Sequence, residues 1–254
     1  MRPLASLLAL CLVLSALACG GDGSSDPAAS DTTAVAGEPE GHDHADSIPS
    51  RAQETARDEG SKPQEVMDYL GVRPGQSVAD IFAGSGYYTY LLSQRVGSSG
   101  RVYAQGYSPG LAARLESGDL SGAGNVVLVD SLSDLPEEGL DAALIIRGYH
   151  LFPDPQALFR PLLRALKPGG VVGVVEVRLG QPQGHDMETH RMGDQQVIDE
   201  FTAAGFELVG SSDILRNPAD DHTEFWEGRR HLADRMLLKF ARPGSPVPPA
   251  TARR

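Results

Sequence analysis

The sequence predicts an α/β fold in which a doubly wound, mostly parallel sheet carries helices on both faces. Short runs rich in Val, Ile and Leu alternate with helical segments from about residue 61 to residue 241. Such alternation is typical of parallel strands joined by crossover helices. A small-residue turn at residues 83–86 joins one apolar run to a helical segment. An apolar content of 41% in 254 residues is enough for one core.

The elements follow from the spacing of apolar residues and from stop signals. The expected strands are 77–82, 101–104, 125–129, 142–146, 171–177, 206–209 and 235–240, and the expected helices are 87–96, 109–115, 156–166 and 195–204. A first helix begins near Ser61, a suitable N-cap, with Pro63 in its first turn. Residues 167–170, Lys-Pro-Gly-Gly, stop the helix before the fifth strand.

The first 19 residues have the pattern of an export signal. Arg2 gives a positive start, residues 4–18 are almost wholly apolar, and small residues precede Cys19. The apolar run is short for a membrane span. Residues 16–20 resemble a bacterial lipobox, although Ala16 replaces its usual Leu. We expect an exported protein, anchored by lipid on Cys19 to a bacterial membrane on its periplasmic or cell-surface side. A plain cleaved secretory signal is the alternative.

The remaining chain divides by composition. We expect a signal peptide over 1–19, a disordered acidic tether over 20–54, a folded domain over 55–242 and a disordered tail over 243–254. Both cysteines, Cys11 and Cys19, precede the domain, so a disulfide and a thiol nucleophile are excluded there. Two histidines at 42 and 44 lie in the tether, where solvation is the simpler interpretation, and we expect no metal site.

The charge of the chain argues against a nucleic-acid substrate. The formal net charge is -12, and residues 20–60 alone hold ten acidic residues against two arginines. The domain itself is therefore mildly acidic and has no stripe of Lys and Arg that would neutralise phosphates. A small or weakly charged substrate fits better. Neither an oligomeric state nor a protein partner follows from the sequence.

The turn after the first strand is the most informative segment. Residues 78–82 form an apolar strand, and Gly84, Ser85 and Gly86 open the next helix. This arrangement exposes backbone N–H groups and bare glycine surface at the carboxyl edge of the sheet, where open α/β sheets bind ligands. Taken alone, the same residues also suit a tight connection without a ligand.

Further motifs at the expected distances favour the ligand site. Asp130 and Ser131 end the third strand, and residues 147–150, Arg-Gly-Tyr-His, follow the fourth. With these, residues 80–86 resemble the first motif of class I S-adenosylmethionine-dependent methyltransferases, and residues 166–170 resemble their strand-five signature. The resemblance covers about residues 60–241. It implies a Rossmann-like, seven-stranded, mostly parallel sheet with an antiparallel C-terminal strand.

A narrower group of predicted, often exported, bacterial methyltransferases is also similar. The similar segments are 83–89, 173–178, 190–191, 217–223 and 238–240. The resemblance implies S-adenosylmethionine as the cofactor. Its amino-acid end would be held by Asp80, Ala83, Gly84, Ser85 and Gly86, and its adenine would lie at Asp130 and Ser131.

One position departs from the family pattern. The acidic residue that usually ends strand two and binds the ribose hydroxyls is replaced by Gly106, with Gln105 beside it. A lost charge-assisted hydrogen bond costs on the order of 1.5–3 kcal/mol of affinity. The sequence therefore predicts weak cofactor binding unless Gln105 or a backbone group substitutes.

Methyl transfer requires in-line positioning, exclusion of water and, for a weakly acidic nucleophile, a base. His150 and Tyr149 follow strand four and are the first catalytic candidates, with a capping or core role as the alternative. The second candidate is the run 220–222, Asp-Asp-His, for which a turn is the simpler interpretation.

Other polar and aromatic residues invite weaker hypotheses. His185, Glu188, His190 and Arg191 form a polar run that could close over the pocket as a lid. The two histidines lack the i, i+4 spacing of a helical zinc site. Trp226 and Phe225 either line the substrate pocket or pack in the core.

Three functions remain after this reasoning. The preferred hypothesis is an S-adenosylmethionine-dependent methyltransferase that acts on an unknown small molecule. The alternative is a non-catalytic exported lipoprotein that uses the same fold to bind a nucleoside-like or other small ligand, which Gly106 would permit. A dehydrogenase ranks last, because the turn lacks the GxGxxG spacing and no acid follows strand two.

Overall fold

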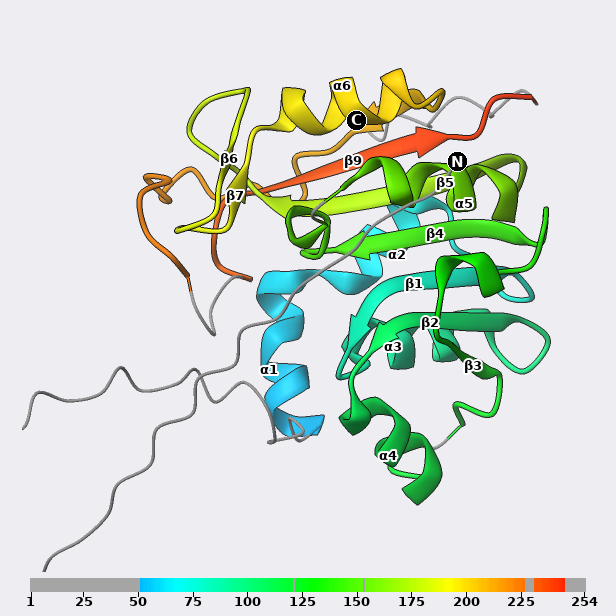
Figure 1. The fold of residues 1–254 in the computed structure, drawn as a ribbon. Coiled ribbons are helices and arrows are strands. Elements are labelled where there is room, and N and C mark those ends of the chain that lie inside the picture. Colours follow the sequence, from blue (N-terminus) through cyan, green and yellow to red (C-terminus); the bar gives the residue numbers. More distant parts are fainter. Residues whose placement is uncertain (1–50, 121, 153, 227–230, 245–254) are drawn as a thin grey trace, which may run out of the picture. The chain divides into compact units, whose positions relative to one another are not determined.

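The computed structural model describes residues 51–120, 122–152, 154–226 and 231–244 (Figure 1). The predicted export signal, Cys19, the two tether histidines and most of the tether and tail lie outside these residues. Predictions about them therefore stay predictions. Within the described part, no helix is both long enough and apolar enough to cross a bilayer.

The described chain alternates helices and strands as expected. The helices are α1 (Arg51–Ser61), α2 (Pro63–Leu70), α3 (Tyr87–Val96), α4 (Pro109–Ser117), α5 (Gln156–Ala165) and α6 (Asp194–Ala203), with short 3-10 turns η1 (Leu132–Asp134) and η2 (Tyr149–Leu151). The strands are β1 (Ser77–Gly84), β2 (Arg101–Tyr107), β3 (Val126–Val129), β4 (Leu140–Ile146), β5 (Leu166–Val177), β6 (His185–Asp186), β7 (Arg191–Met192), β8 (Glu207–Ser211) and β9 (Arg235–Ala241).

Seven strands form one sheet in the order β3-β2-β1-β4-β5-β9-β8. The first five are mutually parallel, and β9 runs antiparallel between β5 and β8. This confirms the predicted doubly wound sheet with an antiparallel C-terminal strand. The strand order reverses between β1 and β4, and such a switch point opens a crevice at the carboxyl ends of the strands.

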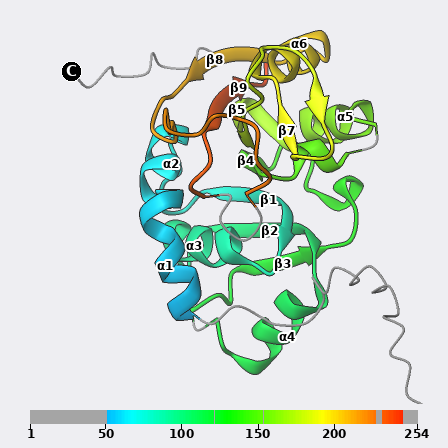
Figure 2. The same cartoon turned by 90° about the vertical axis from the view of Figure 1, so that its left-hand side faces the viewer.

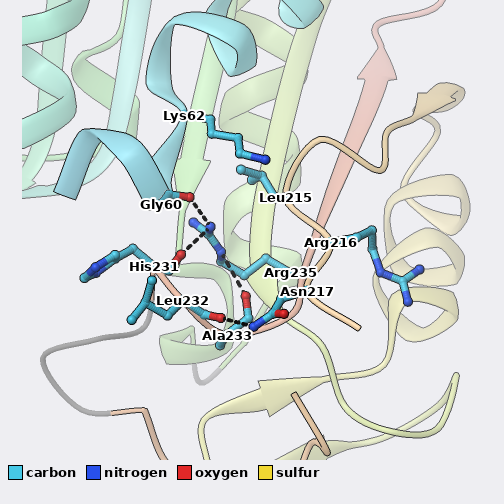
Figure 3. A pocket seen from close by; sticks show the side chains of 9 residues that line it. All are labelled: Gly60, Lys62, Leu215, Arg216, Asn217, His231, Leu232, Ala233 and Arg235. Carbon is cyan, nitrogen blue, oxygen red and sulfur yellow. Dashed lines mark hydrogen bonds between the residues drawn. The ribbon is translucent and has the colours of Figure 1, made fainter. Parts of the chain in front are cut away.

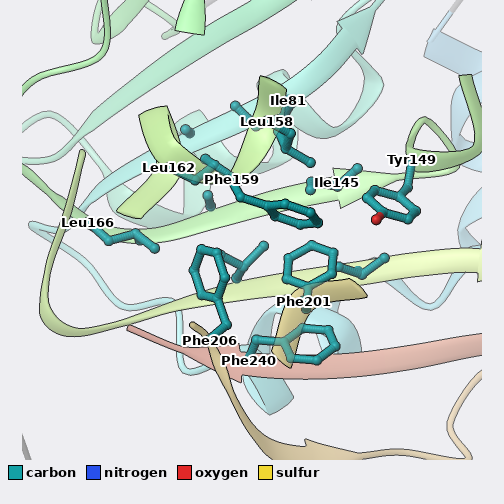
Figure 4. Packing of buried hydrophobic residues seen from close by; sticks show 14 of the residues in the cluster. Ile81, Ile145, Tyr149, Leu158, Phe159, Leu162, Leu166, Phe201, Phe206 and Phe240 are labelled. Carbon is teal, nitrogen blue, oxygen red and sulfur yellow. The ribbon is translucent and has the colours of Figure 1, made fainter. Parts of the chain in front are cut away.

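Helices lie on both faces of the sheet (Figures 1 and 2), and apolar side chains fill the space between them and the strands. On one face, α5 and α6 supply Leu158, Phe159 and Phe201, which pack on strand residues such as Ile145 and Phe240 (Figure 4). The opposite face is covered by α2 and α3. The rings of Phe201 and Phe240 stack with centroids 4.3 Å apart. Because both faces are covered, the strands are apolar along their length rather than alternating.

The N-terminal helix begins earlier than the sequence indicates. Helix α1 starts at Arg51, before the expected start of order near Ser61 and the expected domain boundary at residue 55. Its Glu54 is fully buried and accepts both Nη1 (2.7 Å) and Nη2 (3.1 Å) of Arg114 in α4. A polar, glycine-containing helix lacks a clear apolar period, so tertiary contacts such as this ion pair, rather than its own pattern, mark it as part of the domain.

Candidate functional site

The turn after β1 has the left-handed backbone that its glycines permit. Gly84 has φ 53° and Gly86, at the start of α3, has φ 88°. A Cβ at Gly86 would lie 2.5 Å from Leu111, so this glycine allows α4 to pack closely. A Cβ at Gly84 would meet nothing nearer than the Phe82 carbonyl at 3.9 Å. The Gly84 side of the turn is therefore open to a ligand.

Phe82 also adopts a positive φ, of 61°, which is rare for an aromatic residue. A Cβ at Gly148 would lie 2.7 Å from Phe82 side-chain atoms, and one at Gly106 would lie 3.2 Å from the Phe82 Cα. Its ring meets Phe152 edge to face, with centroids 4.4 Å apart. The two glycines, at the ends of β2 and β4, thus make room for this aromatic ring at the switch point.

Asp80 is buried near the carboxyl end of β1, with 2% of its surface exposed. Its carboxylate accepts the hydroxyl of Thr89 at 2.6 Å, which ties β1 to α3. Burial raises the pKa of Asp80 to about 7, against a weaker lowering by the hydrogen bonds from Thr89. The carboxyl group stands at the predicted edge, and its role toward a cofactor remains a prediction.

A pocket of about 290 Å³ lies where the adenine was predicted, at the ends of β2 and β3. It is lined by Gly106, Tyr107, Pro109, Val129 and Asp130. Two of these residues contact each other, since the Tyr107 hydroxyl donates to Asp130 at 2.8 Å. The neighbouring Ser131 caps the turn η1 and accepts the backbone N–H of Ser133, so its hydroxyl has a structural partner as well.

The end of β2 provides a test of whether the predicted cofactor fits. Oε1 of Gln105 is buried and has no hydrogen-bond partner in the described part of the chain. Such an acceptor is costly unless a donor from a ligand or water reaches it. Gly106 has φ 64° and lies close to β1, so an acidic side chain would be strained there. Gln105 precedes Gly106, which lines the pocket, so an unpartnered acceptor stands next in the chain to the predicted nucleoside site and fits the cofactor in its chemistry. Its contact with the ribose hydroxyls stays a prediction.

Three ionisable side chains form a row at the ends of β4 and β5. Glu176 of β5 is fully buried, and its Oε2 lies 3.0 Å from Nδ1 of His150. Nε2 of His150 lies 3.1 Å from Nδ1 of His190. His150 is 3% exposed, whereas His190 is half-buried. The row therefore leads from the core toward the outer part of the site.

Tyr149 points away from this row. Its hydroxyl donates to Glu200 of α6 at 2.5 Å, and its ring packs between Phe159 and Phe201 (Figure 4). Burial and the Glu200 carboxylate raise the pKa of the phenol. The backbone N–H of Tyr149 donates to Glu176 at 2.6 Å. These contacts hold the loop after β4 in place, and a catalytic part for Tyr149 stays a prediction.

The predicted lid residues form the β6–β7 hairpin, but Arg191 points inward. Its guanidinium makes a two-pronged pair with Asp220, with both N···O distances 3.0 Å. It also donates to the carbonyls of Arg178 and Glu224. Burial tends to raise the pKa of Asp220, but the hydrogen bonds from Arg191 and from backbone N–H groups hold it below its ordinary value. Asp220, for which a turn-forming role was the simpler prediction, thus also anchors the hairpin through Arg191.

Phe225 and Trp226, predicted either to line the substrate pocket or to pack in the core, contact His190 and Asp220. Trp226 donates its indole N–H to Asp220 at 3.2 Å. The ring of Phe225 lies 4.8 Å from that of His190, tilted by 33°. His222 binds Asp234 at 3.0 Å. The separate sequence motifs at 190–191 and 217–223 therefore meet in space through Arg191 and Asp220.

A second pocket, of about 270 Å³, is rimmed by basic residues (Figure 3). Lys62 donates to the carbonyl of Ile214, Arg216 donates to Asp234, and Arg235 donates to the carbonyls of Gly60 and His231. Burial, with Arg57 and two other arginines nearby, lowers the pKa of His231. Lys62 and Arg235 thus join the end of α1 and the residue after it to the segments before and at the start of β9.

Sequence reasoning missed two members of the row of ionisable groups. Glu176 carried no assigned role, although an acidic residue inside the apolar run 171–177 is an available signal of a buried partner. His190 was assigned to a lid rather than to His150. Their contact joins residues 40 positions apart, and no local pattern reports it.

Comparisons with known proteins agree with the geometry. The model of the ubiE/COQ5 methyltransferase family matches residues 43–189. The arsenite methyltransferase of Halobacterium salinarum is 27% identical over 186 residues, which cover 66% of this chain and 46% of that protein. The ubiquinone/menaquinone biosynthesis C-methyltransferase UbiE of Shewanella halifaxensis is 28% identical over 179 residues, covering 68% and 67%.

The fold has clear structural neighbours. The crystal structure of a SAM-dependent methyltransferase from Aquifex aeolicus superposes with a TM-score of 0.59 at 18% identity, covering 75% of this chain and 95% of that one. Among the relatives matched by sequence, this chain spans about half the length of the arsenite methyltransferase and about two thirds of UbiE. The comparisons give no support to the non-catalytic alternative.

Proposed function

Because the chain belongs to the ubiE/COQ5 methyltransferase family, we propose that it transfers the methyl group of S-adenosylmethionine to a small organic molecule. One observation supports this most. The nucleoside-sized pocket at the ends of β2 and β3 and the ionisable row at the ends of β4 and β5 lie on the two sides of the β1–β4 switch point. A cofactor and a proton acceptor can thus serve one crevice.

The residues that would hold the cofactor follow the sheet edge. The turn formed by Ala83, Gly84, Ser85 and Gly86 would take the amino-acid end, near Asp80. Gln105 would take the ribose, and Asp130 with Ser131 would border the adenine. When bound, the cofactor supplies an electrophilic methyl group on a sulfonium. The chain's own tasks are then to orient the nucleophile, exclude water and accept a proton.

The substrate is a nucleophile that has to lose a proton, because the imidazoles of His150 and His190 lie where it would bind. The relatives named as UbiE transfer methyl to carbon, so an activated ring carbon is one acceptor and a hydroxyl is another. Arsenite is a poorer candidate. Soft ions prefer thiolates, and the cysteines of this chain stand only at positions 11 and 19.

The compartment is part of the proposal. The pattern of residues 1–19 supports export and lipid attachment at Cys19, as in the exported bacterial methyltransferases that the sequence resembles. Replacement of Cys19 by Ala should release the protein from the membrane fraction. Continued sedimentation with membranes would count against the lipid anchor and leave the enzymatic proposal intact.

Calorimetric titration of the purified protein tests the cofactor first. We expect saturable binding of S-adenosylmethionine and of S-adenosylhomocysteine, lost in Gly84→Val because a side chain would enter the open side of the turn. Gly118→Val, at an exposed helix end with open space around it, is the matched control. Absence of binding at millimolar ligand would refute the proposal.

A further inference from the structure

The proposed chemistry does not use the buried pair of Glu54 and Arg114, although this pair lies directly behind the cofactor turn. Arg114 is 2% exposed and Glu54 is fully buried. Nη1 of Arg114 donates to Oε1 of Glu54 at 2.7 Å and also to the backbone carbonyl of Ser85 at 3.0 Å. Ser85 belongs to the small-residue turn 83–86. One buried nitrogen therefore joins α1 to the turn that would take the amino-acid end of the cofactor.

Helix α4 and the residue before it hold two carbonyls of this turn. The backbone N–H of Ser108 donates to the carbonyl of Gly84 at 2.9 Å. Arg114, one of the last residues of α4, holds the carbonyl of Ser85. The N–H of Gly86 donates to a carbonyl within the turn, also at 2.9 Å. Because each peptide is planar, these bonds fix the peptides on both sides of Ser85.

The backbone N–H of Ser85 is the group that this arrangement directs. In a planar trans peptide the N–H points opposite the carbonyl, so it points away from the Gly84 carbonyl that Ser108 holds. It has no hydrogen-bond partner in the part of the chain that the structure describes, and Ser85 is half-buried. The Gly84 side of the turn is open. Such a donor requires an acceptor from water or a ligand, and a carboxylate is a strong one.

A buried ion pair is a costly way to hold a helix. Two buried charges lose their hydration, and apolar side chains of similar size often stabilise a protein as well or better. Apolar side chains cannot, however, donate to the Ser85 carbonyl. The guanidinium is a rigid plane, so its two-pronged contact with Glu54 sets the direction of the second N–H of Nη1. Glu54 thereby directs Arg114 at the turn.

We propose that Arg114, oriented by Glu54, is a positioning residue for the amino-acid end of the cofactor. The inference rests on the proposed function and adds to it two residues that act through the turn rather than by touching the cofactor. Arg114 holds the Ser85 peptide so that its N–H meets the carboxylate of the cofactor. Cofactor binding and the docking of α1 on α4 are then linked, and each favours the other by the same factor.

The first test replaces the whole pair, Glu54→Leu with Arg114→Met, because the loss of one partner would leave a buried charge. Asp119, which also accepts from Arg114, is half exposed and can be solvated. The midpoint of urea unfolding should therefore be unchanged or higher. Calorimetric titration should show an affinity for S-adenosylhomocysteine that is lower by about tenfold or more. The affinity for 5′-methylthioadenosine, which has the same nucleoside without the amino-acid end, should be unchanged.

The matched control makes the same substitutions at another ion pair, Glu138→Leu with Arg242→Met. These side chains meet at 2.7 Å at the opposite edge of the sheet, before β4 and after β9. The control should bind both ligands as the unchanged protein does. Equal losses for both ligands in the variant without Glu54 and Arg114 would show general damage to the site and overturn the inference. A folded variant with unchanged affinity for S-adenosylhomocysteine would overturn it as well.

A measurement on the unchanged protein decides the inference if the double variant does not fold. Amide hydrogen exchange is followed with and without saturating S-adenosylhomocysteine. Because docking and binding are linked, the ligand should slow exchange across α1 by about tenfold. Exchange across α6, which packs against β8, should change less. Exchange across α1 that is indifferent to the ligand would overturn the inference.

The outcomes separate the two proposals. If the unchanged protein binds neither S-adenosylmethionine nor S-adenosylhomocysteine, the proposed function is refuted and the inference falls with it. If the unchanged protein binds S-adenosylhomocysteine and the variant without Glu54 and Arg114 binds it equally well, the inference alone is refuted and the proposed function stands.

Discussion

Replacing Asp80 by Asn should remove one pH-dependent contribution to the stability of this protein. Burial raises the pKa of Asp80 from 3.8 to about 7, so the folded state holds a proton that the unfolded state has lost between those values. The free energy of unfolding therefore falls as pH rises through this window. Three pH units correspond to about 4 kcal/mol. Above pH 7, the wild-type protein has the full destabilisation of a buried carboxylate.

Asparagine keeps an acceptor for the Thr89 hydroxyl and removes the ionisation, although its extra N–H donors cost about 1–3 kcal/mol if unpaired. We expect the variant to be more stable than wild type by about 1–3 kcal/mol at pH 8 and no more stable at pH 4.5. Urea titrations at five pH values measure this crossing. Asp213→Asn, whose side chain is 90% exposed, is the control. A stability difference that is independent of pH would refute the raised pKa.

Three further changes test other contacts. Asp220→Ala leaves the buried guanidinium of Arg191 without its carboxylate, and urea titration should show that the free energy of unfolding falls by about 3–5 kcal/mol. A fall below about 1 kcal/mol, typical of an exposed ion pair, would contradict the burial of this pair. Glu54→Gln removes the charge opposite Arg114, and amide exchange should accelerate across α1 before α2; equal protection of the two helices would oppose this role. Gly106→Asp places at the end of β2 the acidic residue that is usual in the family. The positive φ of this position should lower the free energy of unfolding by about 1–2 kcal/mol, and calorimetry should show no gain in cofactor affinity. A clear gain in affinity would show that the turn adapts.

Most of the fold could be predicted because the strands are uniformly apolar and end at polar or glycine-rich turns. Helix α3 begins and ends at the predicted residues, 87 and 96, since Gly86 and Gly97 flank it. The order of the strands is not written in local patterns and was not predicted, whereas the seven-stranded, mostly parallel sheet with its antiparallel C-terminal strand followed from the family resemblance. Helix α1 escaped prediction because polar contacts with distant parts of the chain, among them its buried ion pair with Arg114, hold it rather than an apolar face.

The predicted site residues lie along one edge of the sheet, whereas their contacts could be predicted only in part. The position of His150 after β4 followed from topology, whereas its partners Glu176 and His190 come from β5 and from the residue before β7. Their pairing depends on side-chain directions that periodicity does not specify. The positive φ of Phe82 was equally hidden, because it results from the close approach of Gly106 and Gly148, far away in sequence.

The position of β9 has a consequence for the order in which the protein folds. The last described strand lies between β5 and β8, and within the described chain β8 hydrogen-bonds to no other strand. Residues 207–211 therefore cannot join the sheet until residues 235–241 have arrived. The first five strands can assemble as the chain is synthesised from its N-terminus, but the edge of β5 stays exposed until the end. Completion of the sheet is thus a late, long-range step, and the half-formed domain is the state most open to aggregation or to a chaperone.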